Sequence, residues 1–290
     1  MLHLIHNPAA GRGRGRSTAE RVRAALEAHG RCARVWTTER PGHATALTRT
    51  LPDDATVVAI GGDGTVHEVA AACVGTARTV GIVPTGSGDD FAHALGLPRR
   101  GIAAAVSALL EGRVRTVDTG VCNGVPFVNA VGVGFDAEVG RRVVEAPRPL
   151  AGLGAYLWSV AVSLRDLSLA EVRLEVDGAL RYEGPSLLVS TQNGPRTGGS
   201  FRFAPAARID DGRFEIVLAK RVCRRDVPIL LPKLMAGRHV GDRRVATYSG
   251  GTVTMRWSEP RTWHTEGEIQ APCARFELAV RPGTLRVLAP

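Results

Sequence analysis

Short, mostly apolar runs alternate with helical segments over the first 122 residues of the chain. The runs at residues 2–5, 34–37, 57–60 and 79–83 predict strands. The run at 57–60 contains no polar residue, which is typical of a strand buried on both faces of a sheet. We expect one helix to begin near Ser17 or Thr18 and two others to cover residues 44–51 and 102–110. A fourth helix is expected to run from Asp89 to Gly96, where the glycine caps it and Pro98 prevents its continuation.

The periodicity changes after a strand expected at residues 113–121. Asn123-Gly124 is typical of a β-hairpin turn. Residues 150–167 predict a core helix, although their apolar side chains could instead line the entrance for a lipid; these are Leu153, Tyr156, Leu157 and Trp158. The second half of the chain therefore follows a different architecture from the first.

Short alternating segments separated by turn residues predict an antiparallel β-sandwich, interrupted by one helix at residues 226–235. The expected strands are residues 171–176, 180–183, 186–191, 213–219, 244–248, 253–257, 261–264, 276–280 and 284–288. We place the hinge at residues 121–124, which gives domains at 1–122 and 123–290. The last strand is expected to pack back on the first domain.

Arginine carries almost all of the formal charge of +9, because only Lys220 and Lys233 are lysines. A basic surface favours anionic partners such as nucleotide phosphates or an acidic membrane. The arginine bias could equally reflect a GC-rich genome. Aromatic residues make up only 5% of the chain and no basic stripe is interleaved with them, so nucleic acid is a poor candidate partner. An anionic lipid surface is the better one.

The composition, with 44% hydrophobic and 22% charged residues, is that of an ordinary globular protein. No apolar run reaches the ~20 residues that span a bilayer, and residues 1–8 do not resemble a signal peptide. The five cysteines are scattered singly, which favours reduced thiols and makes a zinc site improbable. We therefore expect a cytoplasmic, peripherally membrane-associated protein, with a homodimer left open.

The run at residues 57–60 leads directly into Gly61-Gly62-Asp63-Gly64-Thr65. Glycines let the backbone turn sharply and approach a ligand, and a helix that opens near Thr65 offers free N–H groups to phosphate. An aspartate in such a turn indicates a cation such as Mg²⁺ between Asp63 and the phosphate. The alternative is a tight turn with an exposed aspartate and no ligand.

Gly61–Thr65 followed by Glu68 resembles the nucleotide-binding signature of the diacylglycerol kinase catalytic-domain superfamily, which includes sphingosine kinases and, more distantly, NAD kinases. Other strings in the same order resemble that family: Asn7-Pro8-x-x-Gly11, Thr38 before a Gly-x-Ala helix start, and Pro84-Thr85-Gly86-Ser87-Gly88-Asp89-Asp90-Phe91-Ala92. In the last string, Ser87 and Asp89 replace the family's threonine and asparagine. The resemblance implies an α/β + all-β protein: an N-terminal Rossmann-like nucleotide-binding domain, a C-terminal β-sandwich domain, and an active site in the interdomain cleft.

The resemblance also implies which residues bind ATP and Mg²⁺. The implied ATP contacts are Asn7, Pro8, Gly11, Thr38, Gly61, Gly62, Asp63, Gly64, Thr65, Glu68, Gly86 and Ser87. Asp63, Asp90 and Asp118 would organise Mg²⁺ and water, because three neighbouring carboxylates need a cation to offset their repulsion. A second Mg²⁺ is implied at Asp211 with the backbone carbonyls of Arg208 and Arg213; the alternative is an Asp-Gly turn without a metal.

His264-Thr265-Glu266-Gly267-Glu268 stands where the family carries Asp-Gly-Glu, whose aspartate is the presumed catalytic base. Glu266 replaces that aspartate, and Glu268 is the second acid. The two acids have similar reference pKa values, ~3.9 and ~4.3, but a glutamate is one methylene longer, and a displacement of about 1 Å can cost on the order of 10²-fold in rate. The alternative is a structural glutamate on a sandwich strand.

These observations predict an ATP-dependent lipid kinase that transfers the γ-phosphoryl group to a lipid hydroxyl. Diacylglycerol is the first acceptor expected, giving phosphatidic acid for phospholipid biosynthesis; phosphatidylglycerol, ceramide or a sphingoid base stay open. Two rivals remain, an NAD kinase-like phosphotransferase and a non-catalytic nucleotide- or lipid-binding homologue. The string ending in Phe91-Ala92 and Glu266-Gly267-Glu268 favour the lipid acceptor.

Overall fold

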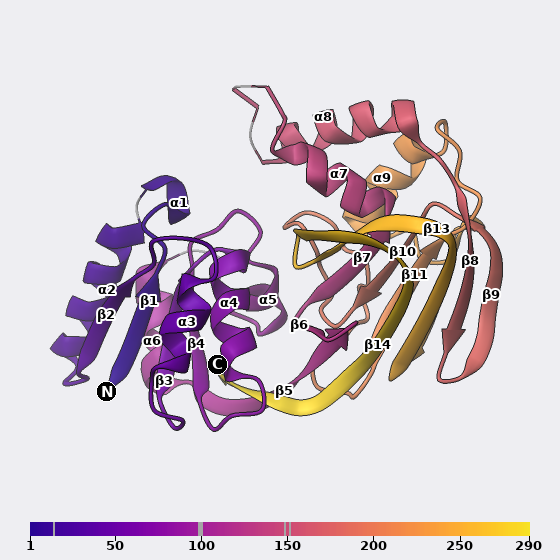
Figure 1. The fold of residues 1–290 in the computed structure, drawn as a ribbon. Coiled ribbons are helices and arrows are strands. Elements are labelled where there is room, and N and C mark those ends of the chain that lie inside the picture. The colour runs from indigo at the N-terminus through magenta and orange to yellow at the C-terminus, as the bar shows by residue number, and fades with distance from the viewer. Residues whose placement is uncertain (14, 98–100, 148, 151) are drawn as a thin grey trace. The chain divides into compact units, whose positions relative to one another are not determined.

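A computed structural model describes the chain except for residues 14, 98–100, 148 and 151 (Figure 1). Its contacts divide the chain into two compact units. The first unit contains Met1–Thr119 together with Arg281–Pro290, and the second contains Gly120–Val280. Pro98, expected to stop a helix, lies outside the described residues.

A parallel sheet forms the centre of the first unit. Its strands are β1 (Leu2–His6), β2 (Ala33–Thr37), β3 (Thr56–Gly61) and β4 (Thr79–Pro84), in the order β4-β3-β1-β2. All of β1 and nearly all of β3 are buried, which explains why these segments lack polar alternation. The four strands expected from the sequence are confirmed to within two residues.

Helices cover both faces of this sheet (Figure 1). α2 (Gly15–Ala28) and α6 (Ile102–Glu111) share one core cluster with β1 and β3. α3 (His43–Arg49) and α4 (Asp63–Cys73) contact each other and these strands as well. Two short helices, α1 (Ala10–Gly13) and α5 (Asp90–Ala94), follow β1 and β4.

The helix expected near Ser17 begins earlier than predicted, at Gly15. A Cβ at Gly15 would lie 2.0 Å from the carbonyl oxygen of Asn7, so a glycine lets the helix start against the end of β1. The helix expected to run from Asp89 to Gly96 is shorter than predicted, because α5 ends at Ala94.

The C-terminal strand completes the first unit. β14 (Glu268–Ala289) ends with Arg286 and Val287 paired in parallel with Thr79 and Val80 of β4. Val287 and nearby Leu285 are fully buried. The C-terminal residues therefore join the parallel sheet beside β4, and β14 also pairs with β5 (Arg113–Cys122).

The second unit is built on antiparallel strands in the order β12-β11-β10-β7-β13-β14, with β8 and β9 extending from β13. The strand bounds are β6 (Val125–Phe127), β7 (Ala130–Gly134), β8 (Ala170–Val176), β9 (Ala179–Ser186), β10 (Leu188–Gln192), β11 (Phe214–Ala219), β12 (Val245–Gly250) and β13 (Thr252–Thr265). The Asn123-Gly124 hairpin is confirmed, since Cys122 pairs with Val125 and both turn residues have positive φ.

β13 changes partner along its length, which makes the strands a sandwich. Its residues 253–257 pair with β8, and its residues 263–265 pair with β7 after a bulge near Arg261. One core cluster joins both parts, including Leu174, Phe214 and Trp263. The strands predicted separately at 253–257 and 261–264 are thus one bent strand, because a bulge bends the chain without ending the pairing; likewise, the last two predicted strands merge in β14.

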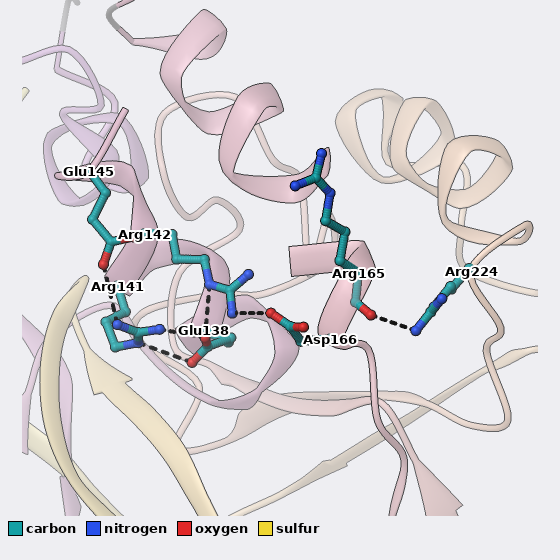
Figure 2. A network of polar contacts seen from close by, with 7 residues as sticks. All are labelled: Glu138, Arg141, Arg142, Glu145, Arg165, Asp166 and Arg224. Atoms are coloured by element: carbon teal, nitrogen blue, oxygen red, sulfur yellow. Dashed lines mark hydrogen bonds and ion pairs between the residues drawn. The ribbon is translucent and has the colours of Figure 1, made fainter. Parts of the chain in front are cut away.

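Four helical segments pack in a second cluster of the same unit: α7 (Phe135–Val143), α8 (Leu153–Ser163), the 3₁₀ helix η1 (Leu164–Asp166) and α9 (Val227–Ala236). Figure 2 shows polar contacts between α7 and η1 and between η1 and the segment before α9. Arg142 of α7 donates to Glu138 at 3.0 Å and to Asp166 of η1 at 2.7 Å. Arg224, shortly before α9, donates to the carbonyl of Arg165.

Candidate active site

Two glycine turns of the first unit pack directly against each other at the carboxyl ends of β3 and β4. A Cβ at Gly86 would lie 2.7 Å from the Cα of Gly62, and a Cβ at Gly61 would lie 2.4 Å from Oγ1 of Thr65. The Thr85 N–H donates to the carbonyl of Gly61 at 2.9 Å. Close approach of the backbone at Gly62 and Gly86, and of the Thr65 side chain at Gly61, therefore favours glycine at these positions.

The N-terminus of α4 opens from this pair of turns. Gly62 is its N-cap and has no side chain that could accept the first N–H groups of the helix. Gly64 lies in the first turn, where a Cβ would meet nothing within 4 Å. N–H groups at a helix start, the positive end of the helix dipole and open space beside the backbone together suit a phosphate group.

Asp63 ties the first glycine turn to the second. Its Oδ1 accepts the N–H of Asp90 at 2.7 Å, and its Oδ2 accepts the N–H of Asp89 at 2.9 Å. Asp89 in turn accepts the Gly86 N–H at 2.9 Å from a left-handed backbone conformation, φ 53°. The Asp63 carboxylate thus stabilises the start of α5 by accepting these two N–H groups. Ser87 lies in the loop that leads to this helix start.

The grouping of Asp63, Asp90 and Asp118 around Mg²⁺ and water stays a prediction. Among the described residues, no group of three or more His, Cys, Asp or Glu side chains is arranged to hold a metal ion. Buried Asp118 accepts the Gly283 N–H at 2.8 Å. Backbone N–H groups thus donate to the Asp63 and Asp118 carboxylates.

The other residues expected to bind ATP follow the same edge of the sheet. Asn7 follows β1, and its side chain accepts the Ala9 N–H. Pro8 precedes α1 and Gly11 lies within it, while buried Thr38 follows β2. Ligands of open parallel sheets bind at this edge. Glu68 has a structural contact of its own, because its two carboxylate oxygens accept the Gly42 and Ala44 N–H groups at 2.9 Å each and so cap α3.

Glu266 lies in the turn between β13 and β14, not on a strand. Thr265 pairs with Glu268, which leaves Glu266 and Gly267 as a two-residue loop with φ of 55° and 87°. Positive φ at both positions is the signature of a type I′ hairpin turn. The strand placement in the alternative reading is therefore wrong, whereas a structural role for Glu266 stays open.

The Glu266 side chain folds back onto the start of β7. Its Oε1 accepts N–H groups from Val128 at 2.8 Å, Asn129 at 2.6 Å and Ala130 at 3.3 Å. The extra methylene of glutamate provides this reach, and the three amides fix one oxygen. Exposed Glu268, the second acid of the string, lies at the start of β14.

The second unit also contains an apolar cavity walled by α7, α8, α9 and strands β10 and β11. Its lining includes Tyr156, Val160, Leu187, Leu231 and Leu234. Tyr156 was expected either in the core or at a lipid entrance, and it lines this cavity, whereas Leu153 and Leu157 are each 42% exposed.

Asp136 and His239 are polar groups in the cavity wall to which the sequence assigned no role. Burial lowers the pKa of His239, whose Nε2 lies 2.8 Å from the carbonyl of Phe203. Its Nδ1 has no hydrogen-bond partner within the described part of the chain. No pattern in the sequence marked either residue as part of a cavity wall.

The Asp211 segment forms a turn. Asp211 Oδ1 accepts the Arg213 N–H at 3.1 Å, and Gly212 has φ of 73°. A metal bound there by Asp211 and the carbonyls of Arg208 and Arg213 stays a prediction.

Comparisons with protein families cover both halves of the chain. The profile described as Diacylglycerol kinase catalytic domain matches residues 1–122, and the profile described as YegS C-terminal NAD kinase beta sandwich-like domain matches residues 129–289. A diacylglycerol kinase of Bacillus subtilis is 29% identical over 269 residues, which covers 91% of this chain and 88% of that protein. A probable lipid kinase YegS-like protein of Pseudomonas aeruginosa is 30% identical over 299 residues, covering 100% and 94%.

Solved structures agree on the fold. A putative diacylglycerol kinase from Bacillus anthracis matches with a TM-score of 0.80 at 24% identity, covering 100% of this chain and 97% of that one. An NAD kinase from Archaeoglobus fulgidus in complex with ATP matches with a TM-score of 0.55 at 13% identity, covering 99% and 93%. With its α/β N-terminal domain and C-terminal β-sandwich, the chain belongs to the diacylglycerol kinase catalytic-domain family.

Proposed function

We propose that this chain is an ATP-dependent lipid kinase whose acceptor is diacylglycerol and whose product is phosphatidic acid. The observation that carries the proposal is the pair of interlocked glycine turns in front of α4, at the carboxyl edge of a parallel sheet. Its family membership supports a kinase reaction, because the relatives are named diacylglycerol kinase and lipid kinase.

ATP would bind with its phosphates against Gly62, Gly64 and Gly86, where the backbone can approach them and α4 supplies N–H groups. Mg²⁺ would accompany ATP and neutralise phosphate charge. The oxygen donors of Asp63 and Asp90 fit its chemistry, and the Asp63 carboxylate has lone pairs beyond its two amide contacts with which to accept bonds from metal-bound water.

The apolar cavity supports a lipid acceptor over NAD. Hydrocarbon side chains dominate its wall, with Asp136, Tyr156 and His239 as the polar exceptions. Acyl chains are stabilised by such burial at about 0.8 kcal/mol per CH₂, whereas a dinucleotide carries charged phosphates that would be costly to place there.

Glu266 would accept the proton of the acceptor hydroxyl through Oε2 as the lipid oxygen bonds to the γ-phosphorus. The bond between that phosphorus and the β,γ-bridging oxygen breaks, and ADP leaves with the electron pair. Three amides on Oε1 hold the carboxylate as a hydrogen-bond acceptor, which suits this role. An active site in the interdomain cleft stays a prediction.

An anionic membrane surface is the proposed source of the acceptor. A hollow beside α9 is lined by Lys220, Arg221, Arg225 and Arg243, while Arg244 in the same hollow is paired with Asp226 at 2.7 Å. Each cation near an anionic surface contributes about 1 kcal/mol. No described helix has the length and apolar character needed to cross a membrane.

Binding of the chain to phosphatidylglycerol vesicles, measured by co-sedimentation, should weaken in the double variant Arg221→Glu/Arg225→Glu. Unchanged binding would contradict the proposed membrane-facing surface.

The test of the reaction is transfer of label from [γ-³²P]ATP to a panel of lipids in mixed micelles, with NAD as a parallel acceptor. Glu266→Gln is the variant to compare, because it keeps the length of the side chain but cannot take the proton. We expect label in diacylglycerol that is strongly reduced in the variant. ATP binding without label in any acceptor would instead support a non-catalytic protein.

A further inference from the structure

His264 is a buried histidine beside the Glu266 turn, and both of its ring nitrogens are engaged. Nδ1 accepts the N–H of Gly267 at 3.2 Å, and Nε2 lies 3.5 Å from Oδ2 of Asp136. His264 and Asp136 are 5% and 8% exposed. Because Nδ1 is an acceptor, the neutral ring carries its proton on Nε2, the nitrogen that faces the carboxylate.

Gly132 makes room for this contact. It lies on β7 directly opposite His264 of β13. A Cβ at Gly132 would lie 2.0 Å from Oδ2 of Asp136 and 2.4 Å from Nε2 of His264. Any side chain at this position would therefore displace the pair, so the strand carries a glycine where Asp136 of α7 reaches across to the next strand.

The turn that this pair contacts has an unfavourable backbone conformation. Glu266 has φ of 55°, in the left-handed region that asparagine, aspartate or glycine tolerates better than glutamate. Such a residue persists only where its surroundings fix it. Three contacts fix this turn. The amides of residues 128–130 donate to Oε1, and the Glu266 N–H donates to the carbonyl of Ala130 at 3.1 Å. The Gly267 N–H donates to Nδ1 of His264.

We propose that Asp136 and His264 are positioning residues for Glu266. Asp136 holds the tautomer and ring orientation of His264, and His264 holds Gly267, whose conformation sets where Oε2 of Glu266 lies. The catalytic consequence rests on the proposed kinase function, in which Oε2 accepts the proton of the acceptor hydroxyl. Asp136 also lines the apolar cavity and accepts the Ala137 N–H through Oδ1, so its own position is fixed.

Two isosteric variants separate the two contacts of His264. His264→Asn keeps an acceptor at the place of Nδ1 and loses the group facing Asp136; His264→Gln keeps a donor at the place of Nε2 and loses the acceptor for Gly267. Asp136→Asn removes the charge with little change in size. Exposed His29→Gln is the matched control. All four are made in the full-length chain, and kcat, KM for diacylglycerol, ATP affinity and hydrogen exchange at the Gly267 amide are measured.

We expect kcat to fall by about 10- to 100-fold in His264→Gln, with ATP affinity unchanged and Gly267 exchange accelerated. His264→Asn should keep slow Gly267 exchange and a kcat nearer to the wild type, and Asp136→Asn should fall between the two. Equal kcat in His264→Asn and His264→Gln, with both variants folded, would overturn the proposal.

Hydrogen exchange separates a failure of this proposal from a failure of the proposed function. If the wild type labels no acceptor, the kinase function fails, and the positioning role is then judged at the Gly267 amide alone. Faster exchange in His264→Gln than in His264→Asn would support the role, and equal exchange would overturn it.

Discussion

At the scale of single residues, the glycines at the carboxyl edge of the parallel sheet have different reasons to be glycine. Gly62 and Gly86 are packed backbone to backbone, whereas Gly64 faces open space. The fold therefore requires glycine at the first two positions whether or not phosphate approaches them, whereas only a phosphate near α4 gives a reason for glycine at the third. Substitution by alanine distinguishes these reasons.

Gly86→Ala should lower the free energy of unfolding by about 1–3 kcal/mol, because its Cβ would overlap the Gly62 backbone. Gly64→Ala should change it by less than about 0.5 kcal/mol yet weaken ATP binding. Urea unfolding and calorimetric titration with Mg·ATP measure the two quantities. A destabilised Gly64→Ala, or one that binds ATP normally, would contradict the assignment of this turn.

Glu266→Asp introduces the residue that the family carries at this position, yet it should lower activity. The shorter side chain withdraws from the amides of residues 128–130, which leaves buried donors unsatisfied at a cost of about 1–3 kcal/mol in stability. We expect lower kcat and a lower melting temperature together. An aspartate variant as stable and active as the wild type would show that the amide contacts are dispensable.

At the scale of elements, the sequence predicted most strands and helices because burial leaves a periodic pattern. The parallel strands and the Asn123-Gly124 hairpin follow from local chemistry alone. What the pattern misses depends on distant partners: β13 continues through a bulge because β7 and β8 pair with different parts of it. The contacts of Glu266 with residues 128–130 likewise join positions far apart in the sequence, so the family resemblance could suggest a catalytic acid but not the amides that hold it.

Helix α9 and strand β12 are linked by an ion-pair network that should respond to acid. Arg244 bonds Asp242 at 2.9 Å and Asp226 at 2.7 Å, and with Lys233 it holds the pKa of Asp242 well below its usual range. Hydrogen bonds from Cys223, followed by Arg244, lower the pKa of Asp226 to about 2.

Carboxylates with lowered pKa values in the folded state stabilise it above the unfolded pKa of ~4, and this stabilisation is lost as the pH falls toward the folded value. Arg244→Gln should therefore melt below the wild type at pH 7, with a difference that shrinks toward pH 2–3. Calorimetric melting across this range measures the effect, and a constant difference would contradict it.

At the scale of the whole molecule, the C-terminal residues 281–290 belong to the first unit, together with the N-terminal residues. Leu285 and Val287 are fully buried in the unit that contains the glycine turns, although they are far from them in the sequence. Sequence periodicity predicted this strand, and its pairing with β4 shows why the C-terminal residues matter for the parallel sheet.

Leu285→Ala should destabilise the first unit by about 2–5 kcal/mol, as expected for truncation of a buried leucine, and Mg·ATP should partly restore its stability. Ile269→Ala, on the same strand but 37% exposed, is the matched control and should have a small effect. Urea unfolding with and without Mg·ATP measures both. Equal effects of the two variants would mean that the last residues are not part of the first unit's core.

The central claim concerns the acceptor, and a competition measures it most directly. The wild-type chain is given [γ-³²P]ATP with diacylglycerol in mixed micelles and NAD in the same reaction, and both products are separated and counted. We predict that the label enters phosphatidic acid. Label in NADP with none in lipid would contradict a lipid kinase and leave the NAD kinase-like reaction in its place.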